Sequence, residues 1–211
     1  MALVNTLHWR YATKQFDSGK RIDESIITDL LKGMNLAPSS YGLQPYEFVV
    51  ISNKDLQEEL MQASYGQVQI RDASHVIVLC AKTNITPEYI DQYVQHIAKI
   101  RSISVEDLRE YRDMMIDAIS QKTDAEVGVW ARNQCYLVLG VLMSLCTDMH
   151  IDSCPMEGFI SEKYNQILNL EEKGLHATLV IPIGYRSSED AMQHMKKVRR
   201  ELDHMTHLYY G

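Results

Sequence analysis

The chain has 211 residues and a formal net charge of −7 at pH 7, and 45% of its residues are hydrophobic and 23% charged. This composition is typical of a soluble globular protein and argues against a disordered one. The acidic balance argues against nucleic acid as the main partner, because proteins that bind DNA or RNA normally present a basic face. We expect a single domain over residues 1–211 that buries a sizeable core.

Hydrophobic periodicity predicts alternating helices and strands in the first half of the chain. The segment from Asp23 to Leu36 begins with an N-cap candidate and places its apolar side chains on one face, which indicates a helix. The run from His75 to Lys82 is nearly all apolar, which indicates a central strand covered on both faces. The other elements predicted here are a helix over residues 3–9, a strand over 46–52, a helix over 55–63 and an irregular polar segment over 64–72.

The second half of the chain is predicted to be mainly helical. Pro87 stands at the favoured first-turn position of a helix. Asp124 to Asp148 is the longest predicted helix, and its apolar surface from Tyr136 to Cys146 belongs at the centre of a core or along a subunit interface. The remaining elements are a helix over 105–120, an extended piece over 152–159, a helix over 161–168, a strand over 176–184 and a charged tail over 189–211. Together they indicate an α+β fold with a central mixed β-sheet wrapped by helices.

The cysteines and the apolar segments indicate the cellular location of the protein. The four cysteines lie far apart, without the spacing of a metal site, which favours reduced thiols and no bound metal. The apolar part of the N-terminus is too short for a signal peptide. The longest apolar stretch, residues 127–149, is interrupted by Arg132, Asn133 and Gln134 and fits a core helix better than a membrane span. We therefore expect a cytoplasmic protein without a membrane partner.

The stretch from Ala37 to Ile51 contains more turn-forming residues than a simple connection needs. Pro38 and Pro45 fix their own φ angles and push the preceding residues toward extended conformations. The serines, glycine and glutamine between them make a stiff loop with hydroxyls, an amide and free backbone N–H groups. Such a loop suits a polar ring system or a phosphate; the alternative is an ordinary helix-to-strand connector.

Two basic clusters could bind an anion. Arg10 and Lys14 lie near the N-terminus, and the second cluster lies within residues 196–200. Arginine offers a planar fork and lysine a mobile charge to a phosphate. The alternative is that each cluster is a solvated basic patch.

The segment from Pro155 to Phe159 offers a third candidate site. Its glycine lets backbone amides approach a ligand closely, although the segment could equally be a turn. Neither a metal site nor a nucleophile or acid–base set is visible in the sequence. Any chemistry should therefore be carried by a cofactor rather than by catalytic side chains.

In this order and spacing, the motifs resemble the FMN-dependent nitroreductase family, in the subgroup of oxygen-insensitive NAD(P)H nitroreductases. The motifs that carry the resemblance are Arg10-Tyr-Ala-Thr-Lys-Gln-Phe16, Ala37-Pro-Ser-Ser-Tyr-Gly-Leu-Gln-Pro45, Asp72-Ala-Ser-His-Val-Ile-Val-Leu-Cys-Ala-Lys82, Pro155-Met-Glu-Gly-Phe159 and Lys197-Val-Arg199. Each is short, and together they extend over nearly the whole chain.

The resemblance implies a nitroreductase-like fold and an intertwined homodimer with FMN in a cleft at the subunit interface. It implies two-electron ping-pong turnover in which NADH or NADPH is the donor and a nitroaromatic compound or a quinone is the acceptor. The alternatives are a flavin or pteridine reductase of the same family, or a flavin-binding protein with little turnover. Outside this family, the alternative is a helical interaction protein without a cofactor.

The resemblance also implies roles for individual residues. Arg10, Lys197 and Arg199 are expected at the FMN phosphate, Lys14 at the pyrimidine edge, Pro38, Ser39 and Ser40 of the neighbouring subunit against the flavin, and Glu157 and Gly158 near N5 through their backbone N–H groups. The other cofactor-binding candidates are Tyr11, Ala12, Gly42, Gln67, Gln69, Gln134, Pro155 and Met156.

Three positions depart from the pattern that the family commonly shows. Ala12 stands where serine is common, Gly42 where asparagine is common, and Gln69 near a position often occupied by lysine. These departures predict an intact flavin pocket with altered contacts. Residues 83–121, expected to cover the substrate side, carry no motif of the family.

Overall fold

The computed structural model describes residues 2–210; residues 1 and 211, the two ends of the predicted domain, lie outside this part. One sheet has the strand order β1-β2-β4-β3, and all three strand pairs are antiparallel. The strands are β1 (Tyr46–Ile51), β2 (His75–Lys82), β3 (Asp152–Ser153) and β4 (Leu175–Gly184). The predicted α+β fold with a central sheet is confirmed, but the sheet is antiparallel where a mixed one was expected. Within the described residues, parallel pairing occurs as an isolated bridge between Ala12 and Ser153.

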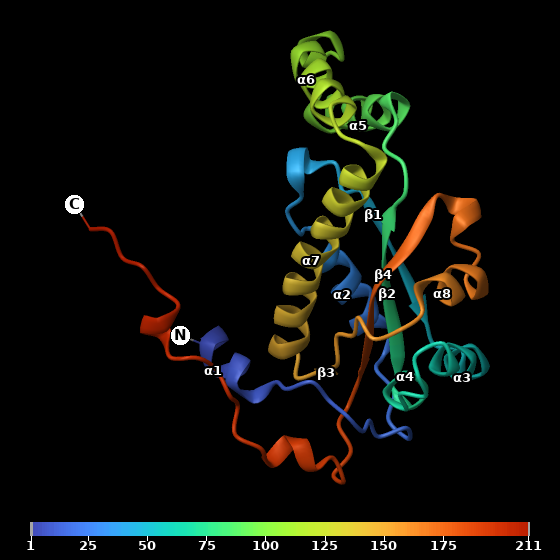
Figure 1. Ribbon diagram of the computed structural model, residues 1–211, viewed down its shortest axis with the longest axis vertical. Coiled ribbons are helices and arrows are strands. Elements are labelled where there is room, and N and C mark those ends of the chain that lie inside the picture. The colour runs from blue at the N-terminus through green and yellow to red at the C-terminus, as the bar shows by residue number, and fades with distance from the viewer. Residues whose placement is uncertain (1, 211) are drawn as a thin grey trace.

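The long helix α7 (Asp124–Asp148) covers one face of the sheet together with α2 (Glu24–Asn35) (Figure 1). A capping box starts α7: Glu126 N–H donates to the Thr123 hydroxyl, while Thr123 N–H donates to the Glu126 carboxylate. The buried side chains between α2, α7 and the sheet include Leu30, Met34, Val138, Leu142, Ile77 and Ile181. α7 was predicted as a core helix, and its inner face has that role.

The outer face of α7 is exposed and partly apolar. It carries Val129, Tyr136 and Leu137. Among the described helices, α7 is also the one whose length and composition would allow it to cross a membrane, a weak signal that core helices of soluble proteins share. In the structure, α7 packs against the sheet.

The opposite face of the sheet is covered by α3 (Lys54–Gln62), α4 (Gln69–Asp72) and α8 (Ser161–Ile167) (Figure 1). Val76 and Val78 of β2 are buried on this side, and Ile77 and Leu79 on the side of α7. The prediction of a central strand buried on both faces is thereby confirmed. The short helix α4 lies where irregular structure was predicted, because four residues are too few to show helical periodicity.

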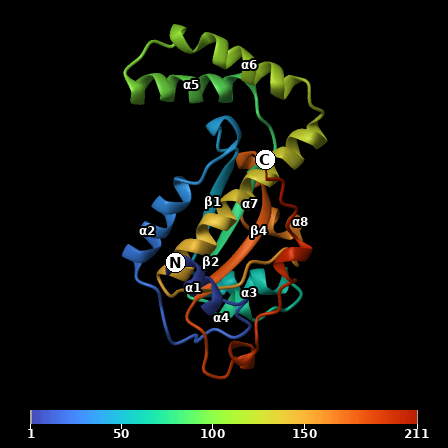
Figure 2. The same ribbon diagram turned by 90° about the vertical axis from the view of Figure 1, so that its left-hand side faces the viewer.

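A hairpin of two helices, α5 (Pro87–Arg101) and α6 (Arg109–Ser120), projects from one end of the sheet (Figure 2). Pro87 lies in the first turn of α5, as predicted, and the Thr86 side chain caps this helix. α6 begins later than the predicted residue 105, because Glu106–Leu108 form a separate 3-10 turn.

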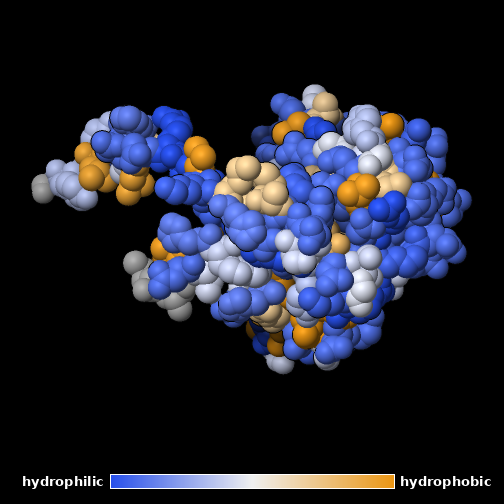
Figure 3. Space-filling view, turned by 90° about the horizontal axis from the view of Figure 1, so that it is seen from below, coloured by the Kyte–Doolittle hydropathy of each residue, from blue (hydrophilic) through white to orange (hydrophobic). Residues whose placement is uncertain are grey.

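The two ends of the chain leave the body on the same side (Figure 1). The N-terminal helix is α1 (Ala2–Trp9); short 3-10 turns occur at Ser40–Gly42, Glu171–Lys173, Ala191–His194 and Leu202–His204. The C-terminal tail projects away from the body and carries exposed apolar side chains (Figure 3). Among them, Val198 is 84% exposed and Tyr209 94% exposed.

All four cysteines are buried and free of disulfides. Burial raises the pKa of Cys80, Cys135 and Cys146 to about 12 and raises the pKa of Cys154. These thiols behave as small core residues, as the sequence predicted.

Leu30→Ala tests the packing of α2 against α7. Leu30 is fully buried (0% exposed), so truncation should lower the free energy of unfolding by about 2–5 kcal/mol. Leu36→Ala is the matched control, because Leu36 follows the same helix and is 83% exposed; its effect should stay under about 0.5 kcal/mol. Urea denaturation measures both, and equal effects would contradict this packing.

Candidate functional site

Three cations from the two ends of the chain meet beside α1. Arg10 follows α1 directly, and the Lys197 ammonium donates a hydrogen bond to the Arg10 carbonyl oxygen. Burial and the nearby Arg199 guanidinium lower the pKa of Arg10. Burial, Arg10 and Arg199 likewise lower the pKa of Lys197. The two basic clusters, which are 187 residues apart at Arg10 and Lys197, therefore converge.

Within residues 2–210, no carboxylate forms an ion pair with this cluster. Among the described residues, none of the ion pairs involves Arg10, Lys14, Lys197 or Arg199. The Arg10 Nε atom is buried without a hydrogen-bond partner in this part of the chain. A buried guanidinium donor without an acceptor is costly, and an anionic ligand would satisfy it. In a chain with a net charge of −7, this is a local site for an anion.

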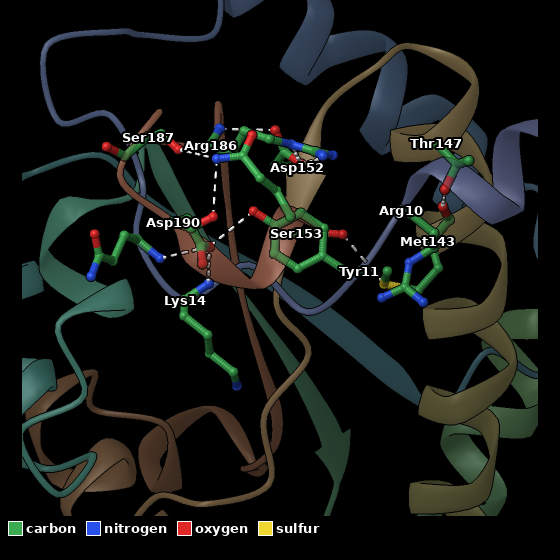
Figure 4. Close-up of polar contacts among 12 residues, drawn as sticks. Arg10, Tyr11, Lys14, Met143, Thr147, Asp152, Ser153, Arg186, Ser187 and Asp190 are labelled. Carbon is green, nitrogen blue, oxygen red and sulfur yellow. Dashed lines mark hydrogen bonds and ion pairs between the residues drawn. The ribbon is translucent and has the colours of Figure 1, made fainter. Parts of the chain in front are cut away.

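Asp190 holds the backbone next to the cluster. Its Oδ2 atom accepts hydrogen bonds from the Lys14 N–H (2.8 Å), the Gln15 N–H (3.1 Å) and the Tyr11 hydroxyl (2.9 Å). Burial alone would raise the pKa of Asp190, but these donors outweigh it and hold the pKa below its usual value. The Lys14 side chain points away from this carboxylate (Figure 4) and is exposed.

Arg186 and Asp152 form the second anchor of this region. Asp152 accepts from the Arg186 backbone N–H and from Arg186 Nε, each at 2.8 Å. The guanidinium lies 4.2 Å from the ring centroid of Trp9 and 4.6 Å from that of Tyr11, within cation–π range of both. Figure 4 shows this network next to Arg10, which lies beside α7 near Met143. The residues on both sides of Arg10 are thus fixed to the turn that follows β4.

The segment from Pro155 to Phe159 presents free backbone donors. Met156 pairs with Val180 of β4, with N–H to O distances of 2.8 and 3.1 Å in the two directions. The next two residues, Glu157 and Gly158, are exposed, and their N–H groups have no partner among residues 2–210. The Gln67 side chain donates to the Gly158 carbonyl oxygen (2.7 Å) and steadies the turn. These N–H groups could donate to a ligand acceptor.

A cavity of about 360 Å³ adjoins this turn, between the outer face of α7 and β4. Its lining residues include Arg132, Tyr136, Glu157, Phe159, His176 and Thr178. The Tyr136 hydroxyl donates to the Glu157 carboxylate at 2.6 Å, which raises the pKa of Tyr136 to about 12. Tyr136 therefore remains protonated near neutral pH and restrains the Glu157 side chain.

The loop of residues 37–45 lies elsewhere in the chain. The Ser40 N–H donates to the Gln134 side-chain oxygen (2.8 Å), and the Gln44 N–H donates to the Ser39 hydroxyl (3.0 Å). Through Gln134 the loop contacts the first half of α7, whereas α1 lies near the C-terminal end of this helix (Figures 1 and 2). Within a single chain, the predicted site residues therefore lie in three places: at the cation cluster, around Gly158 and around Ser40.

The other predicted residues fall within these groups. Gln67 contacts the turn at Gly158, whereas Gln69 is buried in α4 and 7% exposed. Ala12 pairs with Ser153, and the Tyr11 hydroxyl is already bonded to Asp190. Pro38 is exposed beside a groove of about 550 Å³ along α7.

Sequence reasoning missed the residues that hold the site in place. Asp152, Arg186 and Asp190 were not singled out, because their partners lie 34 to 179 residues away along the chain. A lone aspartate in a charged tail carries no local signal. Tyr136 was read only as part of an apolar helix surface.

The geometry fits a ligand with an anionic group and a polar ring system. The cations Arg10, Lys197 and Arg199 suit the anionic group, and the free N–H groups of Glu157 and Gly158 suit an acceptor on a ring. No group of three or more potential metal ligands occurs among the described residues.

Known proteins are similar to this chain in sequence or in fold. A Staphylococcus haemolyticus protein named "putative NAD(P)H nitroreductase" is 36% identical, with 89% of each chain covered. A nitroreductase-like protein of Streptococcus mutans has a similar structure, with a TM-score of 0.87 at 21% identity, covering 99% of this chain and 98% of that one. An Exiguobacterium sibiricum protein crystallised in complex with FMN has a TM-score of 0.83 at 19% identity, covering 98% and 97%. At these identities, the two solved structures establish the shared fold.

The family assignment rests on sequence. A model of the Nitroreductase family matches residues 7–185, which include most of the motifs singled out above and stop short of Lys197 and Arg199. The 36% identity to the staphylococcal protein extends over most of both chains. The chain belongs to the Nitroreductase family.

Proposed function

We propose that this chain is an FMN-dependent oxidoreductase that uses NADH or NADPH to reduce nitroaromatic compounds or quinones. The observation that carries the proposal is the cluster of Arg10, Lys197 and Arg199, which has no carboxylate partner in the described chain. Support comes from family membership, from the names of the relatives and from the FMN complex of a protein with the same fold.

The residues present fit FMN in this site. Arg10, Lys197 and Arg199 hold its phosphate, and the buried Arg10 Nε gains an acceptor. The Glu157 and Gly158 N–H groups donate to the ring system near N5. Lys14 points away from Asp190 (Figure 4) and would hold the pyrimidine edge, where its charge would favour negative charge on the ring. When bound, FMN supplies two-electron redox chemistry, so no side chain is needed as a base.

The donor and the acceptor use the same space in turn, which gives ping-pong kinetics. NAD(P)H binds and leaves before a nitroaromatic compound or a quinone enters. The whole chain works as a single domain of a cytoplasmic protein, and neither nucleic acid nor a membrane takes part; these points remain predictions.

The complete site needs two chains. The Ser40 N–H donates to Gln134 in the first half of α7. This part of the loop lies away from α1, beside which the cation cluster of the same chain lies (Figures 1 and 2). In a homodimer, the exposed face of α7 with Tyr136 and Leu137 packs against its equivalent, and the loop faces the partner's flavin. The C-terminal tail projects from the body and carries exposed apolar side chains (Figure 3). In the homodimer, these side chains cover the partner subunit.

The first test is the visible spectrum of the purified protein under argon. A flavin spectrum that bleaches with NADH or NADPH and returns with a nitroaromatic compound supports cofactor, donor and acceptor together. A bound flavin that neither nucleotide bleaches would reduce the proposal to a flavin-binding protein. Absence of flavin after incubation with FMN would overturn it.

Arg199→Ala tests the phosphate contact. Loss of a charge-assisted hydrogen bond should weaken FMN binding by about 1.5–3 kcal/mol, roughly 10- to 150-fold in Kd. The adjacent Arg200→Ala is the control, because the Arg200 guanidinium bonds to the His204 carbonyl oxygen (3.0 Å) in the tail. FMN fluorescence during dilution gives Kd, and normal retention by Arg199→Ala would remove Arg199 from the site.

Asp190→Asn tests the anchor beside the cluster. The carboxylate has a lower pKa in the folded chain than in the unfolded chain, so it stabilises the fold above about pH 4, and this contribution is lost as the pH falls further. The variant should lose about 1.5–3 kcal/mol of unfolding free energy at pH 7.

The loss should shrink toward pH 3, because below the unfolded-state pKa the unfolded wild-type chain binds the proton and the advantage of the folded carboxylate decreases. Urea denaturation at both pH values measures the difference, with the exposed Asp203→Asn as the control. A loss of equal size at pH 7 and pH 3 would show that the charge of Asp190 contributes nothing.

A further inference from the structure

Three tyrosine hydroxyls from the α5–α6 hairpin bind consecutive parts of the 39–44 loop. Tyr93 of α5 and Tyr111 of α6 both donate to the Tyr41 carbonyl oxygen, at 3.0 and 2.7 Å. The single Tyr89 hydroxyl proton of α5 is shared between the carbonyl oxygens of Leu43 (2.8 Å) and Gln44 (3.0 Å). A carbonyl oxygen has two lone pairs, so both bonds to Tyr41 can form together. We call these three residues the tyrosine clamp.

The clamped backbone is in a conformation that most residues avoid. Tyr41 has φ of 57°, Gly42 of 73° and Gln44 of 46°, all in the left-handed region. Non-glycine residues pay strain for such angles, and that strain persists only where surrounding contacts hold the backbone. On the hairpin side, the three hydroxyls provide such contacts; on the other side, Gln134 accepts from the Ser40 N–H.

Gly42 is fitted to the clamp. A Cβ atom at this position would lie 2.3 Å from the Tyr93 hydroxyl oxygen and 3.3 Å from Tyr93 Cζ. Any side chain at residue 42 would therefore displace the Tyr93 hydroxyl from the Tyr41 carbonyl. The departure from the common asparagine at residue 42 thus has a physical reason: here a tyrosine hydroxyl from the hairpin occupies that space.

The clamp is the main polar attachment of the hairpin. Among residues 2–210, the side-chain hydrogen bonds that link residues 87–120 to residues 2–85 or 124–210 are those of Tyr89, Tyr93 and Tyr111. Leu43 of the loop is 2% exposed and packs into the apolar core of the hairpin with Val94. Arg112 and Asp91 join α6 to α5 within the hairpin. Loop and hairpin therefore form one packed unit (Figure 2).

We propose that Tyr93 and Tyr111 are positioning residues that fix the flavin-facing loop of residues 39–44, and that Gly42 makes room for them. The proposal rests on the proposed function for the statement that this loop faces the partner's flavin. Through the clamp, the hairpin, which carries no motif of the family, sets the position of Ser39 and Ser40. Tyr93 and Tyr111 touch neither cofactor nor substrate in this proposal.

The first experiment measures the loop itself. Tyr93→Phe, Tyr111→Phe and the double variant of the full chain are compared by hydrogen exchange of peptides covering residues 39–46. Loss of one hydroxyl bond should speed exchange of the Gly42, Leu43 and Gln44 amides about three- to tenfold, and the double variant should exceed either single one. Tyr164→Phe is the matched control, because its buried hydroxyl bonds to Ser64 on the other face of the sheet.

The second experiment tests the fit of Gly42 with a double-mutant cycle. Gly42→Ala should lower the urea midpoint, and the same change in a Tyr93→Phe background should lower it less, because the clashing oxygen is gone. Purely additive effects would overturn the pairing. Should Gly42→Ala alone fail to fold, a folded Gly42→Ala/Tyr93→Phe double variant supports the pairing, and failure of both leaves the exchange result to decide.

The third experiment uses the FMN-loaded protein with a nitroaromatic acceptor. The Tyr93→Phe/Tyr111→Phe variant should raise KM about three- to tenfold, while FMN retention and kcat change less than twofold, because the phosphate contacts lie elsewhere. If the two hydroxyls only stabilised the fold, the double variant would contain less folded protein, and its KM would be unchanged. Unchanged KM together with faster exchange would overturn the positioning role.

The outcomes separate this inference from the proposed function. A wild-type protein that binds FMN and a double variant whose loop exchanges like Tyr164→Phe would overturn the clamp and leave the proposed function standing. A wild-type protein that binds no FMN would overturn the proposed function and, with it, the role of the loop toward a flavin.

Discussion

The ion pair between Arg186 and Asp152 fastens the N-terminal segment around Arg10 to the sheet. It is partly buried, joins the turn after β4 to β3, and lets the guanidinium lie against Trp9 and Tyr11. The residues on either side of Arg10 are held in this way, and the Arg10 Nε atom between them is buried. Asp190 extends the same constraint to Lys14 and Gln15.

Acidic and basic groups have separate tasks in this region. The two aspartates bind backbone N–H groups, a tyrosine hydroxyl and one structural arginine, so their charge is already compensated. Arg10, Lys197 and Arg199 then have no counter-ion among residues 2–210. Burial lowers the pKa of Arg10 and of Lys197, and the repulsion between the cations lowers both further. Such a site is preorganised for an anion. The fold already holds the three cations close together, and a bound anion reduces the repulsion between them.

The sequence predicted the parts of the fold that depend on local pattern. The limits of α7 and β2 are those expected, because both are long and strongly patterned. Strand direction was not predictable, since periodicity does not specify which strands pair. For the site, the motifs identified the cations and the turn at Glu157, whereas the aspartate anchors and the tyrosine clamp depend on contacts between distant segments. The hairpin helices themselves could be predicted; their bonds to the loop could not.

The buried cysteines have a consequence for the proposed reduction of quinones. Quinones and partly reduced nitro compounds are electrophiles that add to thiolates, and the thiolate is the reactive form of cysteine. All four thiols of this chain are enclosed in the core and protonated at neutral pH. The protein therefore offers no nucleophilic sulfur to its own proposed acceptors, and repeated turnover would not inactivate it by covalent modification at cysteine.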